Sequence, residues 1–213
     1  MGKLIGIYGG SFDPIHLGHL NLATEMMEAH NLDEVWFCPV ACSPHKSRKA
    51  PVSSEHRLNM LRLAIDEEPR FFVSEIEIER EGLSYTVDTL KELVAGQEGK
   101  EDPDTFALIL GEDSAESFHR WHQPEEIVKL ATLLIGSRLD SEKKIGEFQG
   151  EPGVIEAIRK GLTATRVMEI SSKDIRKRLL NKKYCYHLVP GKVMDYINTN
   201  HLYYYVLNEA RFL

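Results

Sequence analysis

GGSFDPIHLGH, residues 9–19, stands between an apolar run at 4–8 and apolar residues at helical spacing in 18–30. The apolar run predicts a strand that is covered on both faces, as in a parallel sheet. The glycine pair lets the backbone approach a phosphate, and the helix that follows offers free N–H donors. This stretch therefore predicts a strand, a tight turn and a helix N-terminus, where open α/β sheets bind their ligands.

Strand and helix patterns alternate along the rest of the chain. Further strands are expected at residues 34–40, 72–79, 105–110, 132–137 and 166–170. Helices are expected at 58–65 with Ser53 or Ser54 as cap, at 87–94, from Pro124, and at 175–180 behind a capping sequence that begins at Ser171. The alternation predicts an α/β fold with a mostly parallel sheet, formed by a single domain of 213 residues.

Composition narrows the function classes. The net charge of −7 speaks against a surface that binds nucleic acid or an anionic membrane, and no apolar run is long enough to span a bilayer. Three cysteines, without an export signal, argue for a reducing cytoplasm, and Cys38 and Cys42 lack the second Cys/His pair of a zinc site. The exception is a basic island, residues 159–183. Its members are Arg159, Lys160, Arg166, Lys173, Arg176, Lys177, Arg178, Lys182 and Lys183.

His16 and His19 are the first candidates for chemistry. A spacing of three brings both rings to one side of the opening helix turn. A zinc-binding helix would show a spacing of four with an accompanying glutamate, so no metal site is expected here. The residues alone leave two interpretations open, catalysis and structural capping.

A second segment gives these histidines a context. Residues 9–19 contain His-x-Gly-His, and residues 170–176 read Ile-Ser-Ser-Lys-Asp-Ile-Arg. The pair resembles the two signatures of the nucleotidylyltransferase superfamily, which bind the phosphates of a nucleoside triphosphate. The resemblance implies a Rossmann-like, doubly wound sheet, with a small C-terminal helical portion at about residues 171–213 that carries the second signature.

Within the superfamily the chain resembles the bacterial nicotinate mononucleotide adenylyltransferases from residue 4 to about residue 205. Residues 9–19 reproduce that family's opening motif, and Pro44-His45-Lys46 matches its Pro-His-Lys loop. Residues 84–90, Ser-Tyr-Thr-Val-Asp-Thr-Leu, match a third motif, and a fourth combines Gly111, Asp113 and a tryptophan eight residues further on, Trp121. The chain departs from the family pattern at three places, which are Lys173 for threonine, the loop Ser137–Asp140, and His122 for a second aromatic residue.

The resemblance implies transfer of an adenylyl group from ATP to nicotinate mononucleotide. His16, His19, Lys46 and Arg176 are the expected catalytic residues, with His19 near the α-phosphate and Arg176 on the leaving pyrophosphate. Mg²⁺ is expected to arrive with ATP, without a metal site built by the protein. The expected ATP-binding residues are Gly9, Gly10, Ser11, Phe12, His16, His19, Gly111, Asp113, Ile170, Ser172 and Arg176.

Nicotinate mononucleotide is expected at Ser11, Lys46, Tyr85, Thr86 and Trp121. Trp121 would stack on the pyridine ring, and the backbone of Tyr85 and Thr86 would receive the carboxylate. Local pattern alone would favour a core tryptophan, and only the spacing from Asp113 favours the site. The role of His45 stays open.

Three other interpretations compete with this one. A phosphopantetheine adenylyltransferase would share residues 9–19 and 170–176, but not residues 84–90 or Trp121. A nucleotide-binding domain without activity would keep the fold, although the intact histidines argue against it. An RNA-binding protein could use the basic island, which lacks interleaved aromatic residues. The expected partners are small molecules rather than nucleic acid or membrane, and homo-oligomerisation is left open.

Overall fold

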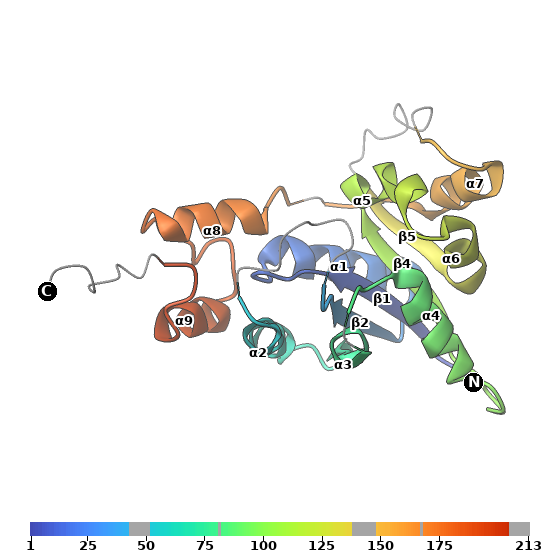
Figure 1. Ribbon diagram of the computed structural model, residues 1–213, viewed down its shortest axis with the longest axis horizontal. Coiled ribbons are helices and arrows are strands. Elements are labelled where there is room, and N and C mark those ends of the chain that lie inside the picture. The colour runs from blue at the N-terminus through green and yellow to red at the C-terminus, as the bar shows by residue number, and fades with distance from the viewer. Residues whose placement is uncertain (43–51, 81, 138–147, 167, 205–213) are drawn as a thin grey trace, which may run out of the picture.

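A six-stranded parallel sheet forms the centre of the computed structural model, which describes residues 1–42, 52–80, 82–137, 148–166 and 168–204 (Figure 1). The strand order is β3-β2-β1-β4-β5-β6, and every neighbouring pair is parallel. The strands are β1 (Leu4–Gly10), β2 (Glu34–Pro39), β3 (Phe71–Val73), β4 (Thr105–Gly111), β5 (Thr132–Ser137) and β6 (Leu162–Ala164). The order reverses between β1 and β4, which confirms the predicted doubly wound α/β fold.

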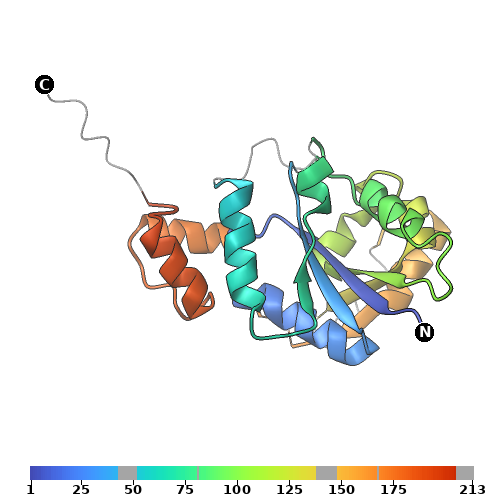
Figure 2. The ribbon, with the colours of Figure 1, turned by 90° about the horizontal axis from the view of Figure 1, so that it is seen from below.

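Helices cover both faces of the sheet (Figure 2). Buried residues of α1 (Leu17–His30), α2 (Ser54–Ile65), α8 (Ser172–Leu180) and α9 (Gly191–Thr199) belong to one hydrophobic core. Buried residues of α4 (Thr86–Ala95), α5 (Glu112–Glu116), the short 3₁₀ helix η1 (Phe118–Arg120), α6 (Pro124–Leu130) and α7 (Pro152–Gly161) belong to a second core. The sheet therefore separates two cores.

The alternation of side chains along β4 explains this division. Phe106, Leu108 and Leu110 pack into the core with α4 and α7, while Ala107 and Ile109 pack into the core with α1. Successive side chains of a strand point to opposite faces, so a strand covered on both sides must be apolar throughout. This is the pattern that identified the strand in the sequence.

Two strand predictions were wrong. Residues 72–79 contain only β3 and then a short helix, α3 (Ile76–Arg80), and the last strand is β6 rather than residues 166–170. Both are edge strands, whose length is set by the one neighbour with which they pair. β3 pairs with β2 only at Val35–Phe37, and β6 pairs with β5 only at Ile135–Ser137. Alternation of apolar residues cannot reveal where a partner strand stops.

The predicted helix caps can be compared with the structure at α2 and α8. Ser53 is the N-cap of α2, and its hydroxyl accepts from the N–H of His56 at 3.4 Å. Ser171 is the N-cap of α8, but its side chain makes no capping hydrogen bond, so the expected capping box there was wrong. The hydroxyl of Ser172 instead donates to the carbonyl of Pro14 at 2.9 Å. The start of α8 is thus fixed by the segment after β1.

Candidate active site

A cavity of about 1140 Å³ opens at the carboxyl ends of β1 and β4, where the strand order reverses. Its walls come from segments far apart in the sequence, namely the turn after β1, the starts of α4 and α5, the segment after η1, and residues 168–171. This is the position at which doubly wound sheets bind ligands, and the volume suffices for a nucleotide. The expected site residues on its walls are Gly9, Gly10, Ser11, His16, His19, Tyr85, Thr86, Gly111, Asp113, Trp121 and Ile170.

His16 and His19 cap the helix that they begin. Nδ1 of His16 accepts from the N–H of His19, and Nδ1 of His19 accepts from the N–H of His16, both at 3.3 Å. The two rings stack with centroids 3.6 Å apart and an interplanar angle of 17°. Structural capping, one of the two interpretations left open by the sequence, is therefore present. It does not exclude chemistry, because both rings also line the cavity.

Capping fixes the chemical state of these rings. An Nδ1 that accepts a hydrogen bond carries no proton, so the neutral tautomer places its N–H on Nε2. His16 is 5% exposed, and burial lowers its pKa to about 4. At neutral pH the His16 ring is thus an uncharged donor, held by backbone contacts at its other nitrogen.

The turn before the histidines is anchored by Phe12. Its backbone adopts a left-handed conformation, φ 45°, which is rare for a residue with a side chain. Its ring is 1% exposed and packs edge-on against Tyr8 and His19, with centroids 5.5 and 5.1 Å apart. Phe12 is not among the residues that line the cavity. Phe12 is therefore a buried residue that positions the turn and the His19 ring without lining the cavity itself.

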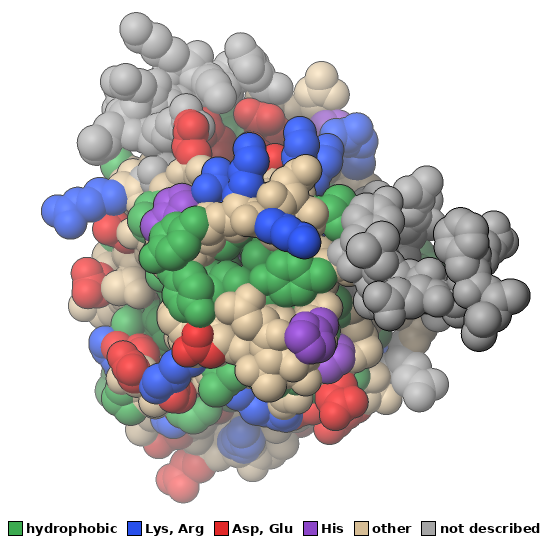
Figure 3. Space-filling view, turned by 90° about the vertical axis from the view of Figure 1, so that its left-hand side faces the viewer, with side chains coloured by type: hydrophobic (Ala, Val, Ile, Leu, Met, Phe, Trp, Pro, Cys, Tyr) green, Lys and Arg blue, Asp and Glu red, His purple; other side chains and the backbone are tan. Residues whose placement is uncertain are grey.

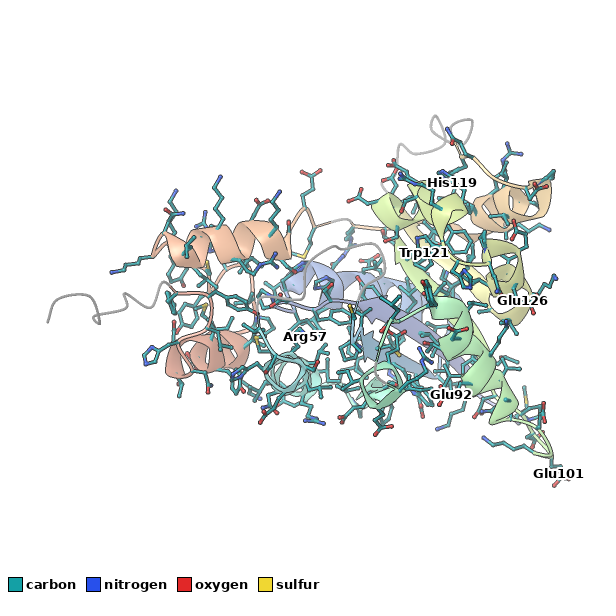
Figure 4. All side chains as sticks on the ribbon, in the orientation of Figure 1. Arg57, Glu92, Glu101, His119, Trp121 and Glu126 are labelled. Carbon is teal, nitrogen blue, oxygen red and sulfur yellow. The ribbon has the colours of Figure 1, made fainter. Side chains whose placement is uncertain are left out.

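Arg57, which the sequence did not single out, holds the same turn from α2 (Figure 4). The guanidinium donates to the carbonyls of Ser11 and Val40 at 3.0 and 2.8 Å, and to the hydroxyl of Ser54 at 3.1 Å. It is 1% exposed, and burial lowers its pKa. In the sequence Arg57 follows a polar helix start and would be assigned to solvent. Only the contact with Ser11 reveals its role.

Ser172 and Arg176 of the second signature contact the first signature directly. Ser172 donates to Pro14, and Nη1 of Arg176 donates to the carbonyl of Asp13 at 2.5 Å. Neither side chain is part of the cavity wall, to which Ser171 and Asp174 contribute on this side. A guanidinium has five N–H donors, so the bond to Asp13 leaves this group able to contact an anion as well.

The opposite wall carries the residues expected to bind the mononucleotide. Tyr85 is the N-cap of α4 and Thr86 its first residue, and both line the cavity, so the helix start with its unpaired N–H groups lies at this wall. Trp121 lines the cavity at the end of η1, with its ring centroid 5.2 Å from that of Phe118 (Figure 4). His122 lies with its ring centroid 4.7 Å from that of Tyr85. The residue that departs from the family pattern is therefore part of this wall.

Buried polar residues fix the segment that leads to Tyr85. The hydroxyl of Ser84 accepts from the N–H of Ala41 at 3.0 Å, which joins this segment to the chain after β2. The hydroxyl of Thr89 donates to Glu77 at 2.9 Å. Glu77 is 5% exposed, lines the cavity, and has its pKa raised by burial. The sequence analysis missed Glu77, since it lies in the stretch at 72–79 that was predicted to be a strand.

Some predicted residues lie outside the described part of the chain. These are His45 and Lys46 of the Pro-His-Lys loop, and residues 138–140 of the loop after β5. Lys173 is exposed at the start of α8. Among the described residues there is no cluster of three or more His, Cys, Asp or Glu side chains that could hold a metal ion, and no helix long and apolar enough to cross a membrane.

The basic island is mainly an exposed surface. Lys177, Lys182 and Lys183 are exposed, while Arg178 is half-buried and donates to the carbonyl of Tyr184 at 2.8 Å. Figure 3 views the molecule from the side of α8 and α9, where Lys and Arg side chains stand beside a group of hydrophobic ones. Arg176 is the member of the island that contacts the first signature.

Comparison with known proteins defines the class first. The model of the family described as cytidylyltransferase-like matches residues 7–178. Its match includes the end of β1, the histidine pair and the second signature, so the class of the chain is that of the cytidylyltransferase-like nucleotidyltransferases.

Individual relatives define the family within this class. A protein of Salinibacter ruber named "Probable nicotinate-nucleotide adenylyltransferase" is 38% identical over 200 residues, which cover 93% of this chain and 97% of the relative. A protein of the same name from Geobacillus kaustophilus is 39% identical over 203 residues, covering 95% and 87%. The solved structure of Plasmodium falciparum nicotinic acid mononucleotide adenylyltransferase complexed with NaAD has a TM-score of 0.72 and 26% identity, covering 94% of this chain and 97% of that one. The chain belongs to the nicotinate-nucleotide adenylyltransferase family, as its motifs predicted.

Proposed function

We propose that this chain transfers the adenylyl group of ATP to nicotinate mononucleotide, forming nicotinate adenine dinucleotide and pyrophosphate for NAD biosynthesis. The observation that carries the proposal is the one cavity that the histidine pair, the Tyr85-Thr86 helix start and Trp121 line together. Family membership supports the same reaction over the phosphopantetheine and non-catalytic alternatives.

The reaction needs no protein nucleophile. A 5′-phosphate oxygen of the mononucleotide attacks the α-phosphorus of ATP, a new P–O bond forms, and the bond to the β-phosphate oxygen breaks as pyrophosphate leaves. The attacking oxygen is already anionic, so the protein must contribute alignment of the two phosphates and stabilisation of the charge that develops.

The phosphate side of the cavity supplies that stabilisation. The Nε2–H groups of His16 and His19 donate to the phosphates, with His19 at the α-phosphate. Their orientation is supported by the reciprocal Nδ1 bonds, so the two donors are held in place before the reaction begins. Arg176 and the N-terminus of α8 receive the leaving pyrophosphate, and Lys46 adds positive charge. Gly9, Gly10 and Ser11 line the nucleotide, with Gly111 and Asp113 near a ribose and Ile170 beside the base.

The acceptor side selects the mononucleotide. Trp121 stacks on the pyridine ring, and the N–H groups at Tyr85 and Thr86 bind the nicotinate carboxylate at the positive end of α4. His122 stands beside Tyr85 and forms part of this wall. Ser11 and Lys46 contact the mononucleotide phosphate from the other side.

Mg²⁺ enters as part of the MgATP substrate. It commonly binds substrate phosphates with few protein ligands, and among the described residues no group of three or more His, Cys, Asp or Glu side chains could hold the ion. The metal neutralises phosphate charge when bound, while the side chains above orient the reacting groups. A cytoplasmic location remains a prediction from the three free thiols, and the oligomeric state remains open.

Activity with alternative acceptors tests the proposal. The purified chain is incubated with MgATP and either nicotinate mononucleotide or phosphopantetheine, and pyrophosphate and the adenylylated product are quantified. Equal amounts of pyrophosphate and dinucleotide are expected with the mononucleotide, and no product with phosphopantetheine. Adenylylation of phosphopantetheine alone would overturn the proposal.

A further inference from the structure

A buried carboxylate lies in the turn that we assign to the ATP phosphates. The Asp13 side chain is 2% exposed, and the hydroxyl of Tyr203 donates to its Oδ1 at 2.6 Å. Nη1 of Arg176 lies 4.0 Å from Oδ2 of the same carboxylate. A buried charge requires such partners, since burial without them is strongly unfavourable. Asp13 therefore connects the last described turn of the chain with the guanidinium assigned to pyrophosphate.

Tyr203 is held in this position by the fold around it. Its φ of 66° is left-handed, a conformation that a tyrosine rarely adopts and that persists where surrounding contacts enforce it. The turn before it is closed by the N–H of Leu202, which donates to the carbonyl of Ile197 at 3.0 Å. Burial, with the Asp13 charge nearby, raises the pKa of Tyr203, so the phenol stays protonated and acts as a donor.

We propose that Tyr203 is a positioning residue for ATP, because its hydroxyl satisfies the Asp13 carboxylate and so allows Arg176 to serve the phosphates. The inference rests on the proposed function of Arg176. It extends the ATP site to a residue that lies after α9, 190 positions from Asp13.

The two arginines near Asp13 differ in their freedom to move. Arg57 is buried and its two terminal nitrogens are bound to two carbonyls and a hydroxyl, so it is held in place, and the Asp13 charge already acts on it there. The Arg176 side chain is 28% exposed. If the Tyr203 hydroxyl is removed, the carboxylate loses a donor, and Arg176 is the cation that can close the 4.0 Å gap. ATP must then compete with Asp13 for that guanidinium.

A matched pair of variants tests this inference. Tyr203→Phe removes the hydroxyl that binds Asp13. Tyr204→Phe removes the neighbouring hydroxyl, which donates to Asn198 at 2.6 Å within the helical portion. Direct titration of MgATP into the free enzyme should show about tenfold weaker binding for Tyr203→Phe and unchanged binding for Tyr204→Phe, because a hydrogen bond to a charged group is worth about that factor. The KM for nicotinate mononucleotide should stay within about twofold in both.

A second arm separates positioning from loss of structure. Arg176→Ala should weaken ATP binding strongly in the wild-type background but only slightly when Tyr203→Phe is present, since both changes remove the same contact. Independent effects that multiply, or equal losses for both substrates, would overturn the inference while leaving the proposed function intact. Failure of the wild-type chain to bind MgATP would instead overturn the proposed function.

Discussion

The buried imidazole of His16 makes the stability of this fold depend on pH in a way that one substitution removes. In the folded chain the pKa of His16 is about 4, against 6.5 for a free imidazole, because burial disfavours the charged ring. Below pH 6.5 the His16 ring binds a proton in the unfolded chain but stays neutral in the folded chain until the pH approaches 4. The stability from neutral His16 is therefore complete above pH 6.5 and is lost as the pH falls toward 4.

The magnitude follows from these two values. The full difference corresponds to about 3 kcal/mol, and about 2 kcal/mol of it is lost between pH 7.5 and pH 5.0. His16→Asn removes the titrating ring and keeps a side chain that caps helices well. The free energy of unfolding of this variant should therefore fall less over that interval than the wild-type value, by about 2 kcal/mol.

Urea unfolding at pH 7.5 and pH 5.0 measures both values. His201→Asn is the matched control, because it makes the same chemical change at an exposed residue whose left-handed φ of 51° suits asparagine. The control should show the wild-type decrease in stability between the two pH values. If His16→Asn shows that same decrease, the His16 ring is not the buried neutral group described above.

Four further changes test the assigned roles. His19→Ala should lower kcat by on the order of a hundredfold through loss of a donor at the α-phosphate, and near-normal turnover would remove it from that role. Arg176→Ala should weaken ATP more than the mononucleotide, with only partial rescue by lysine, because the bidentate fork is lost. Replacing Lys182 and Lys183 together should change ATP binding little. A larger effect than that of Arg176→Ala would mean that this lysine pair, and not Arg176, is the part of the basic island that serves the site. Trp121→Ala should raise KM for nicotinate and nicotinamide mononucleotides alike, and an effect on only one would contradict ring stacking.

The part of the fold that the sequence predicted best is local. The strand, turn and helix start at residues 4–19 could be predicted from these residues alone. An apolar run, a glycine pair and helical spacing follow one another there, and none of these signals depends on the rest of the chain. The lengths of the edge strands could not be predicted in this way. β3 and β6 each extend only as far as they pair with β2 and β5, and this pairing depends on residues distant in the sequence. Helix α7, which the sequence analysis did not anticipate, packs on β5 against the second core.

For the candidate site, too, some residues could be predicted from local motifs and others could not. The motifs identified residues that line one cavity, although they are scattered from residue 9 to residue 170. The sequence did not predict the side chains that hold those motifs in place. Arg57 and Tyr203 contact the turn after β1 from 46 and 190 residues away, and nothing near them in the sequence indicates that contact. Buried polar partners of this kind are specified by the folded chain rather than by local pattern.

The preference for nicotinate over nicotinamide mononucleotide tests the central claim most directly. The two acceptors differ only in a carboxylate against a carboxamide, the group that we propose is bound by the N–H groups at Tyr85 and Thr86 of the cavity wall. Hydrogen bonds to a charged group contribute roughly 1.5–3 kcal/mol each, and a carboxamide leaves some of those donors unpaired. The value of kcat/KM with MgATP should therefore be at least about a hundredfold higher for nicotinate mononucleotide. Equal values for the two acceptors, or no dinucleotide from either, would contradict the account.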